Sequence, residues 1–210
     1  MENNKMQVAE TLRNAPNIFD HPWIIRGLER IALPLLKWRG WTHHVEAPAE
    51  KKYVLIIAPH TSNWDFPLMF PVGLLLKRRV RFMAKHTLFV GPVGSVLRWL
   101  GGIPVERGSH HNFVKQMADE FGKAEEMVLI IAPEGTRSPV KSWKSGFYHI
   151  ACEAGVPIVR CYLDAGRRRA GIWAPFYPTG DAEADMKALR ADYDQVIPRY
   201  PEKFIRSDAA

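Results

Sequence analysis

The chain has 210 residues, of which 47% are hydrophobic and 24% are charged, and its formal net charge is +7. These shares lie near the averages of globular proteins, so they exclude a disordered chain and a polytopic membrane protein, and the length fits one domain with a sizeable core. The positive charge indicates an anionic partner, which a phospholipid surface, a phosphorylated substrate or a nucleic acid would each provide.

The N-terminal region predicts an amphipathic segment. Its first residues mix both signs of charge without an apolar core, so no secretory signal is expected. Residues 23–41 place apolar side chains near helical spacing, with basic side chains between them and two tryptophans at the end. The charges argue against a transmembrane helix and favour a helix lying in a membrane interface, although a helix packed on the body of the domain is the alternative. We expect residues 1–45 to form this membrane-interface segment and residues 46–210 to form the main domain.

From residue 53 onward, short aliphatic runs alternate with longer amphipathic segments, which predicts an α/β domain with a mostly parallel central sheet flanked by helices. The predicted strands are Tyr53–Ala58, Val80–Ala84, Ile103–Val105, Met127–Ala132 and Pro157–Leu163. The predicted helices span residues 65–77, 93–100, 110–124, 143–154 and 182–196. In such sheets the chemistry collects at the carboxyl ends of strands, so the residues that follow each strand are the candidates for a site.

A histidine and an aspartate follow the first predicted strand, in the run Pro-His-Thr-Ser-Asn-Trp-Asp at residues 59–65. A hydroxyl group is a poor nucleophile until a base takes its proton, and histidine, with a reference pKa of about 6.5, suits that task. A carboxylate such as Asp65 would orient the ring of His60 and stabilise its protonated form. The spacing alone is weak, because Asp65 could cap a helix and His60 could be a structural histidine.

A second polar cluster, Pro-Glu-Gly-Thr-Arg-Ser at residues 133–138, follows the strand Met127–Ala132. Its glycine permits close approach of the backbone, and Arg137 offers a planar fork of donors that suits phosphate or carboxylate. The cluster therefore predicts an anion site, although a turn with a surface arginine would look the same. Both clusters would lie at the same edge of a parallel sheet.

Four blocks of sequence in this order resemble the glycerolipid acyltransferase family, which includes 1-acylglycerol-3-phosphate acyltransferase, and the resemblance covers roughly residues 50–165. The blocks are His60–Asp65, Gly102–Arg107, Pro133–Ser138 and Val156–Val159. Lys85 and the segment Gly91–Gly101 also resemble the stretch that precedes the arginine of the second block.

The resemblance implies a role for each matching residue. His60 would be the general base and Asp65 its orienting partner. The residues that would hold the polar head of the acceptor are Arg107, Glu134, Gly135, Thr136 and Arg137. No covalent acyl-enzyme is implied, in line with the absence of a Gly-x-Ser-x-Gly nucleophile elbow from the sequence.

The implied activity is transfer of an acyl group to the hydroxyl of a lysophospholipid-like acceptor in phospholipid biosynthesis, with residues 46–210 as the acyltransferase domain. The donor would be acyl-CoA or acyl carrier protein, and no cofactor or metal is expected, because the two adjacent histidine pairs lack a usual zinc spacing. The enzyme would be peripheral, on the cytoplasmic side of the cell membrane. Cys152 and Cys161 lie in apolar stretches and predict a pair of buried free thiols, which favours a reducing compartment.

The sequence departs from the family pattern at two positions. Pro59 stands where the family usually has asparagine, and Arg160 stands where the family usually has proline after the fourth block. If Arg160 lies at a strand exit, it would face the same crevice as His60 and Arg137. A solvated arginine is the alternative.

Two other functions fit parts of this pattern. A thioesterase or hydrolase would use the same histidine and aspartate to activate water. A non-catalytic basic module would bind a membrane or nucleic acid through its charge, but it leaves the two strand-exit clusters unexplained. The sequence also lacks an aromatic-basic recognition motif, so no nucleic-acid partner is expected.

Overall fold

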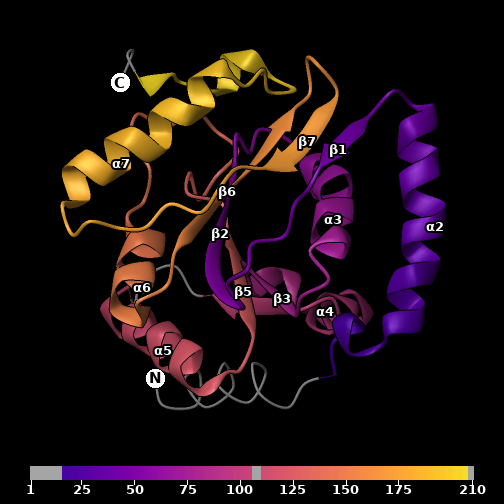
Figure 1. The fold of residues 1–210 in the computed structure, drawn as a ribbon, viewed down its shortest axis with the longest axis horizontal. Coiled ribbons are helices and arrows are strands. Elements are labelled where there is room, and N and C mark those ends of the chain that lie inside the picture. The colour runs from indigo at the N-terminus through magenta and orange to yellow at the C-terminus, as the bar shows by residue number, and fades with distance from the viewer. Residues whose placement is uncertain (1–15, 106–109, 208–210) are drawn as a thin grey trace.

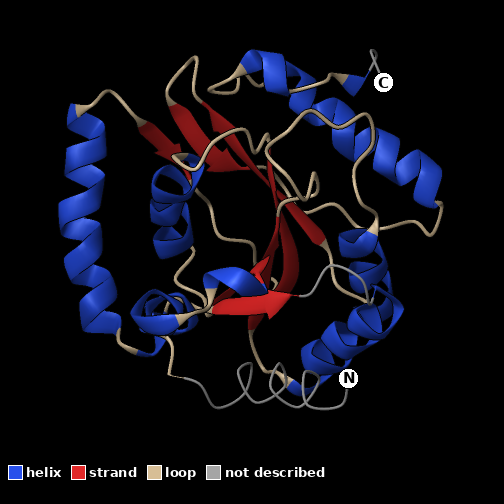
Figure 2. Ribbon diagram, turned by 180° about the vertical axis from the view of Figure 1, so that it is seen from behind, coloured by secondary structure: helices blue, strands red, loops and turns tan. Residues whose placement is uncertain are grey.

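The computed structural model describes residues 16–105 and 110–207, in which seven strands form one sheet with helices on both faces (Figures 1 and 2). The strands are β1 (Thr42–His44), β2 (Lys52–Ala58), β3 (Val80–Lys85), β4 (Gly102–Val105), β5 (Met127–Ile131), β6 (Ile158–Asp164) and β7 (Arg169–Ile172). Their order across the sheet is β1-β7-β6-β2-β5-β3-β4. Strands β6, β2, β5, β3 and β4 run parallel, so the predicted α/β fold with a mostly parallel sheet is confirmed.

The helices of the described residues are α2 (Pro22–Trp38), α3 (Asp65–Leu75), α4 (Gly91–Trp99), α5 (His110–Lys123), α6 (Gly146–Ala154) and α7 (Ala182–Ala191). Four short 3₁₀ turns accompany them: η1 (Ile18–Asp20), η2 (His86–Leu88), η3 (Asp192–Gln195) and η4 (Pro201–Lys203). One face of the sheet is covered by α5, α6 and α7 through Phe121, Phe147 and Leu189, and the other by α3 through Met69 and Val72 (Figure 1). The central strand β2 is therefore buried on both faces, as expected of a parallel sheet.

Two short strands at one edge of the sheet were not predicted. Strand β7 pairs antiparallel with β6, and β1 pairs parallel with β7. Neither is visible as an apolar run, because β1 contains the pair His43 and His44 and β7 begins at Arg169. Arg167 lies in the turn before β7, where its guanidinium pairs with Asp164 at 2.7 Å.

The prediction that Arg160 lies at a strand exit was wrong. Strand β6 continues to Asp164, so Arg160 lies inside it and pairs in register with Ile56 of β2. Its guanidinium forms an ion pair with Asp192 and donates to the carbonyl of Ala174 at 2.8 Å. Because alternate side chains of a strand point to opposite faces, Arg160 is directed to the face that carries α7 and η3, away from the strand ends.

Helix α2 has two different apolar faces. On its inner face, Ile25 packs with Ile18 and with Leu74 of α3. On its outer face Trp23 and Trp38 are 73% and 78% exposed. The helix thus packs on the body of the domain and still presents apolar side chains to its surroundings. No helix among the described residues has the length and apolar character needed to cross a membrane.

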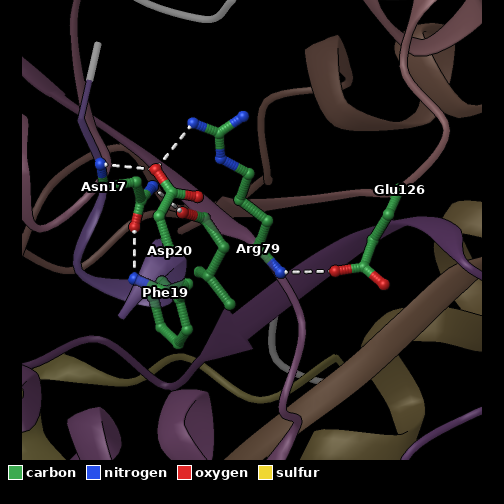
Figure 3. A network of polar contacts seen from close by, with 6 residues as sticks. Asn17, Phe19, Asp20, Arg79 and Glu126 are labelled. Carbon is green, nitrogen blue, oxygen red and sulfur yellow. Dashed lines mark hydrogen bonds and ion pairs between the residues drawn. The ribbon is translucent and has the colours of Figure 1, made fainter. Parts of the chain in front are cut away.

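Polar contacts tie the start of α2 to the sheet (Figure 3). Asp20 accepts the backbone N–H of Asn17 at 2.9 Å and pairs with the guanidinium of Arg79 at 3.0 Å. The backbone N–H of Arg79 donates to Glu126 at 2.8 Å, and the amide of Asn17 donates to the carbonyl of Val80 at 3.2 Å. The segment before α2 is therefore fixed against the loops at the amino ends of β3 and β5.

Candidate active site

The two polar clusters meet because β2 and β5 are parallel neighbours. Ile56 of β2 pairs in register with Ile131, the last residue of β5, so the loops after both strands leave the sheet at nearly the same level. The first loop begins with the cis peptide bond between Ala58 and Pro59 and leads through His60 into α3. The structure thus brings both strand-exit clusters to one edge of the sheet.

His60 and Asp65 are in contact. The Nδ1 atom of His60 lies 3.2 Å from Oδ2 of Asp65, whose side chain is only 3% exposed. The same carboxylate oxygen accepts the backbone N–H groups of Thr61 at 2.8 Å and Ser62 at 2.7 Å. Asp65 therefore fixes both the turn and the histidine ring. Because Asp65 engages Nδ1, Nε2 is the ring nitrogen left to exchange a proton with a bound substrate.

Glu134 lies behind His60. It is only 6% exposed, and its Oε1 atom accepts the backbone N–H of His60 at 3.0 Å. Burial raises the pKa of Glu134 to about 7, although the hydrogen bond from His60 acts in the opposite direction. Its carboxylate thus joins the two strand-exit loops, which differs from the head-group contact implied by the resemblance.

A cavity of about 1280 Å³ opens beside His60. Part of its wall is apolar, formed by side chains from α3, β3, η2, α4 and α5, among them Phe66, Phe82, Leu88, Leu97 and Phe113. The second strand-exit cluster forms another part through Gly135, Thr136 and Arg137. Such a combination of a large apolar wall with a few polar groups is typical of a small-molecule site.

Three cations line this cavity: Lys85, Arg137 and Lys144. Within residues 16–105 and 110–207, none of them forms an ion pair with a carboxylate. The acidic residue on the wall is Glu153. The cations accordingly give the cavity wall positive charge that suits an anionic group.

Lys144 was not among the predicted site residues. Its backbone N–H donates to the carbonyl of Pro133 at 2.9 Å, and its side chain lies against Gly135. Gly135 has a φ of +64°, and a Cβ atom there would lie 3.0 Å from the Cδ and Cε atoms of Lys144. Glycine thus leaves room for Lys144 beside the second cluster. The signal in the sequence was a lysine a few residues after that cluster, just before α6.

Other predicted residues have different outcomes. Arg107 lies outside the described residues, although Val105, where β4 ends, lines the cavity. The expected pair of buried thiols was half wrong, because Cys161 is buried but Cys152 is exposed on the cavity wall. In the described part of the chain, no group of three or more His, Cys, Asp or Glu side chains is placed to hold a metal ion.

Solved structures and curated sequences give an independent comparison. The crystal structure of the 1-acyl-sn-glycerophosphate acyltransferase PlsC from Thermotoga maritima superposes with a TM-score of 0.53 over 80% of this chain and 77% of that one, at 20% identity. The chain is 28% identical over 122 residues to 1-acyl-sn-glycerol-3-phosphate acyltransferase of Haemophilus influenzae, covering 53% of this chain and 49% of the relative. It is 33% identical over 116 residues to the human 1-acyl-sn-glycerol-3-phosphate acyltransferase beta, covering 52% and 41%.

The chain thus spans about half the length of the curated relatives that it matches. The crystal structure supports the fold, and the sequence matches support common ancestry. The model of the Acyltransferase family matches residues 41–164, which is more than half of the chain and includes both strand-exit clusters. From this match, the fold and the site, we conclude that the chain belongs to the acyltransferase family.

Proposed function

We propose that this chain moves a fatty acyl group from a thioester donor, acyl-CoA or acyl carrier protein, to the hydroxyl of a lysophospholipid-like acceptor of the 1-acylglycerol-3-phosphate type. This reaction belongs to phospholipid biosynthesis. The observation that carries the proposal is the contact between His60 and Asp65 on the wall of a cavity that combines apolar side chains with three cations. The names of the curated relatives support the choice of acceptor.

In the proposed mechanism, Nε2 of His60 takes the proton of the acceptor hydroxyl while the oxygen attacks the thioester carbonyl. The tetrahedral intermediate collapses with cleavage of the carbon–sulfur bond, and the imidazolium returns its proton to the leaving thiolate. The products are the ester and the free thiol. The carboxylate of Asp65 stabilises the imidazolium of His60 while it holds the proton, and Glu134 fixes the backbone of His60 by accepting its N–H.

The two kinds of lining residue suit the two ends of the acceptor. Arg137 and Lys144, with Lys85 also on the wall, would bind the phosphate of the head group, and the resemblance adds Arg107 to this set. Gly135 and Thr136 would shape the loop around it. The apolar wall would accept acyl chains. The volume of about 1280 Å³ exceeds the roughly 300–1,000 Å³ of common ligand pockets, which leaves room for parts of both substrates.

The outer face of α2 is the proposed contact with an anionic membrane surface. Its exposed apolar side chains are Trp23, Ile31, Leu35 and Trp38, and three exposed cations, Arg26, Arg30 and Lys37, lie along one edge of this face. Tryptophan side chains are favoured at the membrane interface, and each nearby cation adds about 1 kcal/mol of attraction to anionic lipids. The protein would bind as a peripheral enzyme on the cytoplasmic side.

The test offers the purified protein a labelled acyl thioester together with a panel of lysolipids. The proposal expects thiol release that depends on the acceptor, with the label recovered in the acylated lipid. Thiol release at the same rate without any acceptor, with the label recovered as free fatty acid, would instead identify a thioesterase. If the folded protein forms neither an acylated lipid nor a free fatty acid, the result would contradict an enzymatic role.

A further inference from the structure

A second group of exposed apolar side chains lies on η2 and α4. Val90 and Val93 are 73% and 65% exposed, and Leu88 and Val96 are about half exposed. Val93 and Val96 are three residues apart in α4, so their side chains share one side of the helix, and Val90 is the extended residue just before it. We call this surface, formed by Leu88, Val90, Val93 and Val96, the valine face. A folded protein seldom leaves such a surface open without a partner for it.

The valine face does not result from a loosely held helix. Gly94 packs directly on the chain at Phe89, since a Cβ atom at this position would lie 2.2 Å from the carbonyl carbon of Phe89. The guanidinium of Arg98 donates to the carbonyl oxygen of Phe89 at 3.2 Å and lies 5.5 Å from the centre of its ring. These contacts hold the inner side of α4 against the domain, which leaves the valines directed outward.

The valine face continues into the wall of the proposed active site. Leu88 belongs to both surfaces, because it is exposed and also lines the cavity. Leu97, next to Val96 in the sequence, lines the cavity, as does Phe66 at the start of α3. An apolar path therefore leads from the outside of α4 into the cavity beside His60.

The exposed charged residues that precede the valine face in the sequence are positive. Residues 66–105 contain no Asp or Glu. Of their six Lys or Arg residues, Arg78 and Arg79 pair with Glu126 and Asp20, and Arg81 is buried. Lys85 and His86, at the junction of β3 and η2, are both exposed. A surface of anionic lipid complements this charge and also accepts apolar side chains.

The valine face also belongs to the same packed unit as α2. Trp99 and Leu100, at the end of α4, join the apolar cluster formed by Ile24, Ile25 and Leu28 of α2. Figures 1 and 2 show α4 beside the N-terminal end of α2. One packed unit thus carries two exposed apolar faces.

We infer that the valine face inserts into an anionic lipid leaflet and connects the cavity to the bilayer, so that the acyl chain of the acceptor passes from lipid to the site along an apolar path. This inference rests on the proposed function for the identity of the ligand, and it adds a second membrane contact to that of α2. The apolar character of the face favours lipid over acyl carrier protein, because recognition of an acidic protein would place cations rather than valines at the centre of the contact.

The experiment measures sedimentation of the full chain with mixed phosphatidylglycerol and phosphatidylcholine vesicles, without substrates. The double variant Val93→Glu with Val96→Glu should lower the vesicle partition coefficient by about tenfold or more, because two apolar side chains no longer enter the leaflet. Its control adds the same two charges to α7 through Ala184→Glu with Ala188→Glu, at two exposed positions. This control should change the partition coefficient by less than about threefold, as expected of screened charges away from the contact.

Three results would overturn the inference. The valine variant could bind vesicles like the wild type, or both double variants could lose binding equally, which would indicate a response to net charge alone. Third, vesicle binding could persist while binding of acyl carrier protein is lost, which would assign the face to that protein. If the glutamate variant fails to fold, the double variant Val93→Thr with Val96→Thr replaces it, because threonine has nearly the shape of valine. The inference requires this variant to bind vesicles more weakly than the wild type.

Turnover of a short, water-soluble thioester and lysolipid separates this inference from the proposed function. The valine variant should keep that turnover, since neither Val93 nor Val96 lines the cavity. If the wild type is inactive toward every acceptor but the valine variant alone loses vesicle binding, the membrane contact is supported and the proposed function is contradicted. If the wild type is active but the valine variant binds vesicles as the wild type does, the proposed function is supported and the membrane contact is contradicted.

Discussion

The carboxylate of Glu134 accepts the backbone N–H of His60 at 3.0 Å, and this bond joins residues 74 positions apart in the chain. It connects the loop after β5 to the loop after β2. Because Glu134 is buried, removing its acceptor oxygen would leave the N–H of His60 unsatisfied, which costs about 1–3 kcal/mol. We therefore propose that Glu134 acts on the reaction through the position of His60.

Substitution of Glu134 distinguishes this role from binding of the head group. Glu134→Gln keeps an oxygen that can accept the N–H of His60, so kcat should stay within about threefold of the wild type, whereas Glu134→Ala should lower kcat by about tenfold or more. The acceptor KM should change little in both variants. Steady-state kinetics with varied acceptor concentration measures both constants. A raised acceptor KM with an unchanged kcat would indicate that Glu134 binds the head group instead.

The raised pKa of Glu134 also predicts how stability depends on pH. Its pKa is 4.5 in the unfolded chain and about 7 in the folded protein, so the unfolded state loses its proton first as the pH rises. This group therefore lowers the free energy of unfolding between pH 4.5 and 7, by about 3 kcal/mol in total. Urea unfolding of the wild type and Glu134→Gln across this range should show the difference. Parallel pH profiles for the two proteins would show that Glu134 does not titrate in this way.

Arg137 and Lys144 should act on the acceptor. Each charge-assisted hydrogen bond to a phosphate contributes roughly 1.5–3 kcal/mol, so Arg137→Ala and Lys144→Ala should each raise the acceptor KM by about tenfold or more. Arg137→Lys should recover only part of the loss, because lysine lacks the planar donor fork. If neither variant changes KM or kcat, the anion binds elsewhere.

Arg160 provides the matched control for these cations, because its guanidinium pairs with Asp192 on the face of the sheet that carries α7. Arg160→Gln should reduce the free energy of unfolding by about 1 kcal/mol and leave the ranking of lysolipid acceptors unchanged. Thermal unfolding and the acceptor panel measure the two effects. An altered ranking of acceptors would mean that Arg160 affects substrate binding in the cavity.

The two faces of α2 predict separate effects. Ile25→Ser on the inner face should lower the free energy of unfolding by about 2 kcal/mol, because Ile25 is buried against Leu74. Ile31→Ser on the outer face, where Ile31 is 70% exposed, should leave stability nearly unchanged and weaken vesicle binding. Chemical unfolding and vesicle sedimentation check the pair. Equal destabilisation by both substitutions would mean that the outer face is also packed.

The sequence predicts the parallel strands and both strand-exit clusters, because buried parallel strands read as continuous apolar runs and their exits carry the polar residues. It misses β1 and β7, whose pairing depends on neighbouring strands and not on their own composition. The predicted strand Pro157–Leu163 nearly matches β6, but the interpretation of Arg160 as a strand exit was wrong, because its charge interrupts the apolar run and Asp192 neutralises that charge in the fold.

The directions in which the site side chains point could not be predicted from the sequence either. Glu134 and Gly135 are neighbours in one motif, yet Gly135 lines the cavity whereas the carboxylate of Glu134 turns toward His60. Lys144 joins the second cluster only because the chain returns to Pro133 before α6 begins. Such relationships depend on tertiary contacts that no local pattern encodes.

The most direct test of the account is the rate of acceptor-dependent ester formation by His60→Ala, measured beside the wild type and the control His149→Ala. Both histidines line the cavity, but Asp65 contacts His60. General-base catalysis predicts that His60→Ala loses at least about 10²-fold in kcat with an unchanged melting temperature, while His149→Ala keeps activity within about threefold. Near-normal turnover by folded His60→Ala would contradict the mechanism.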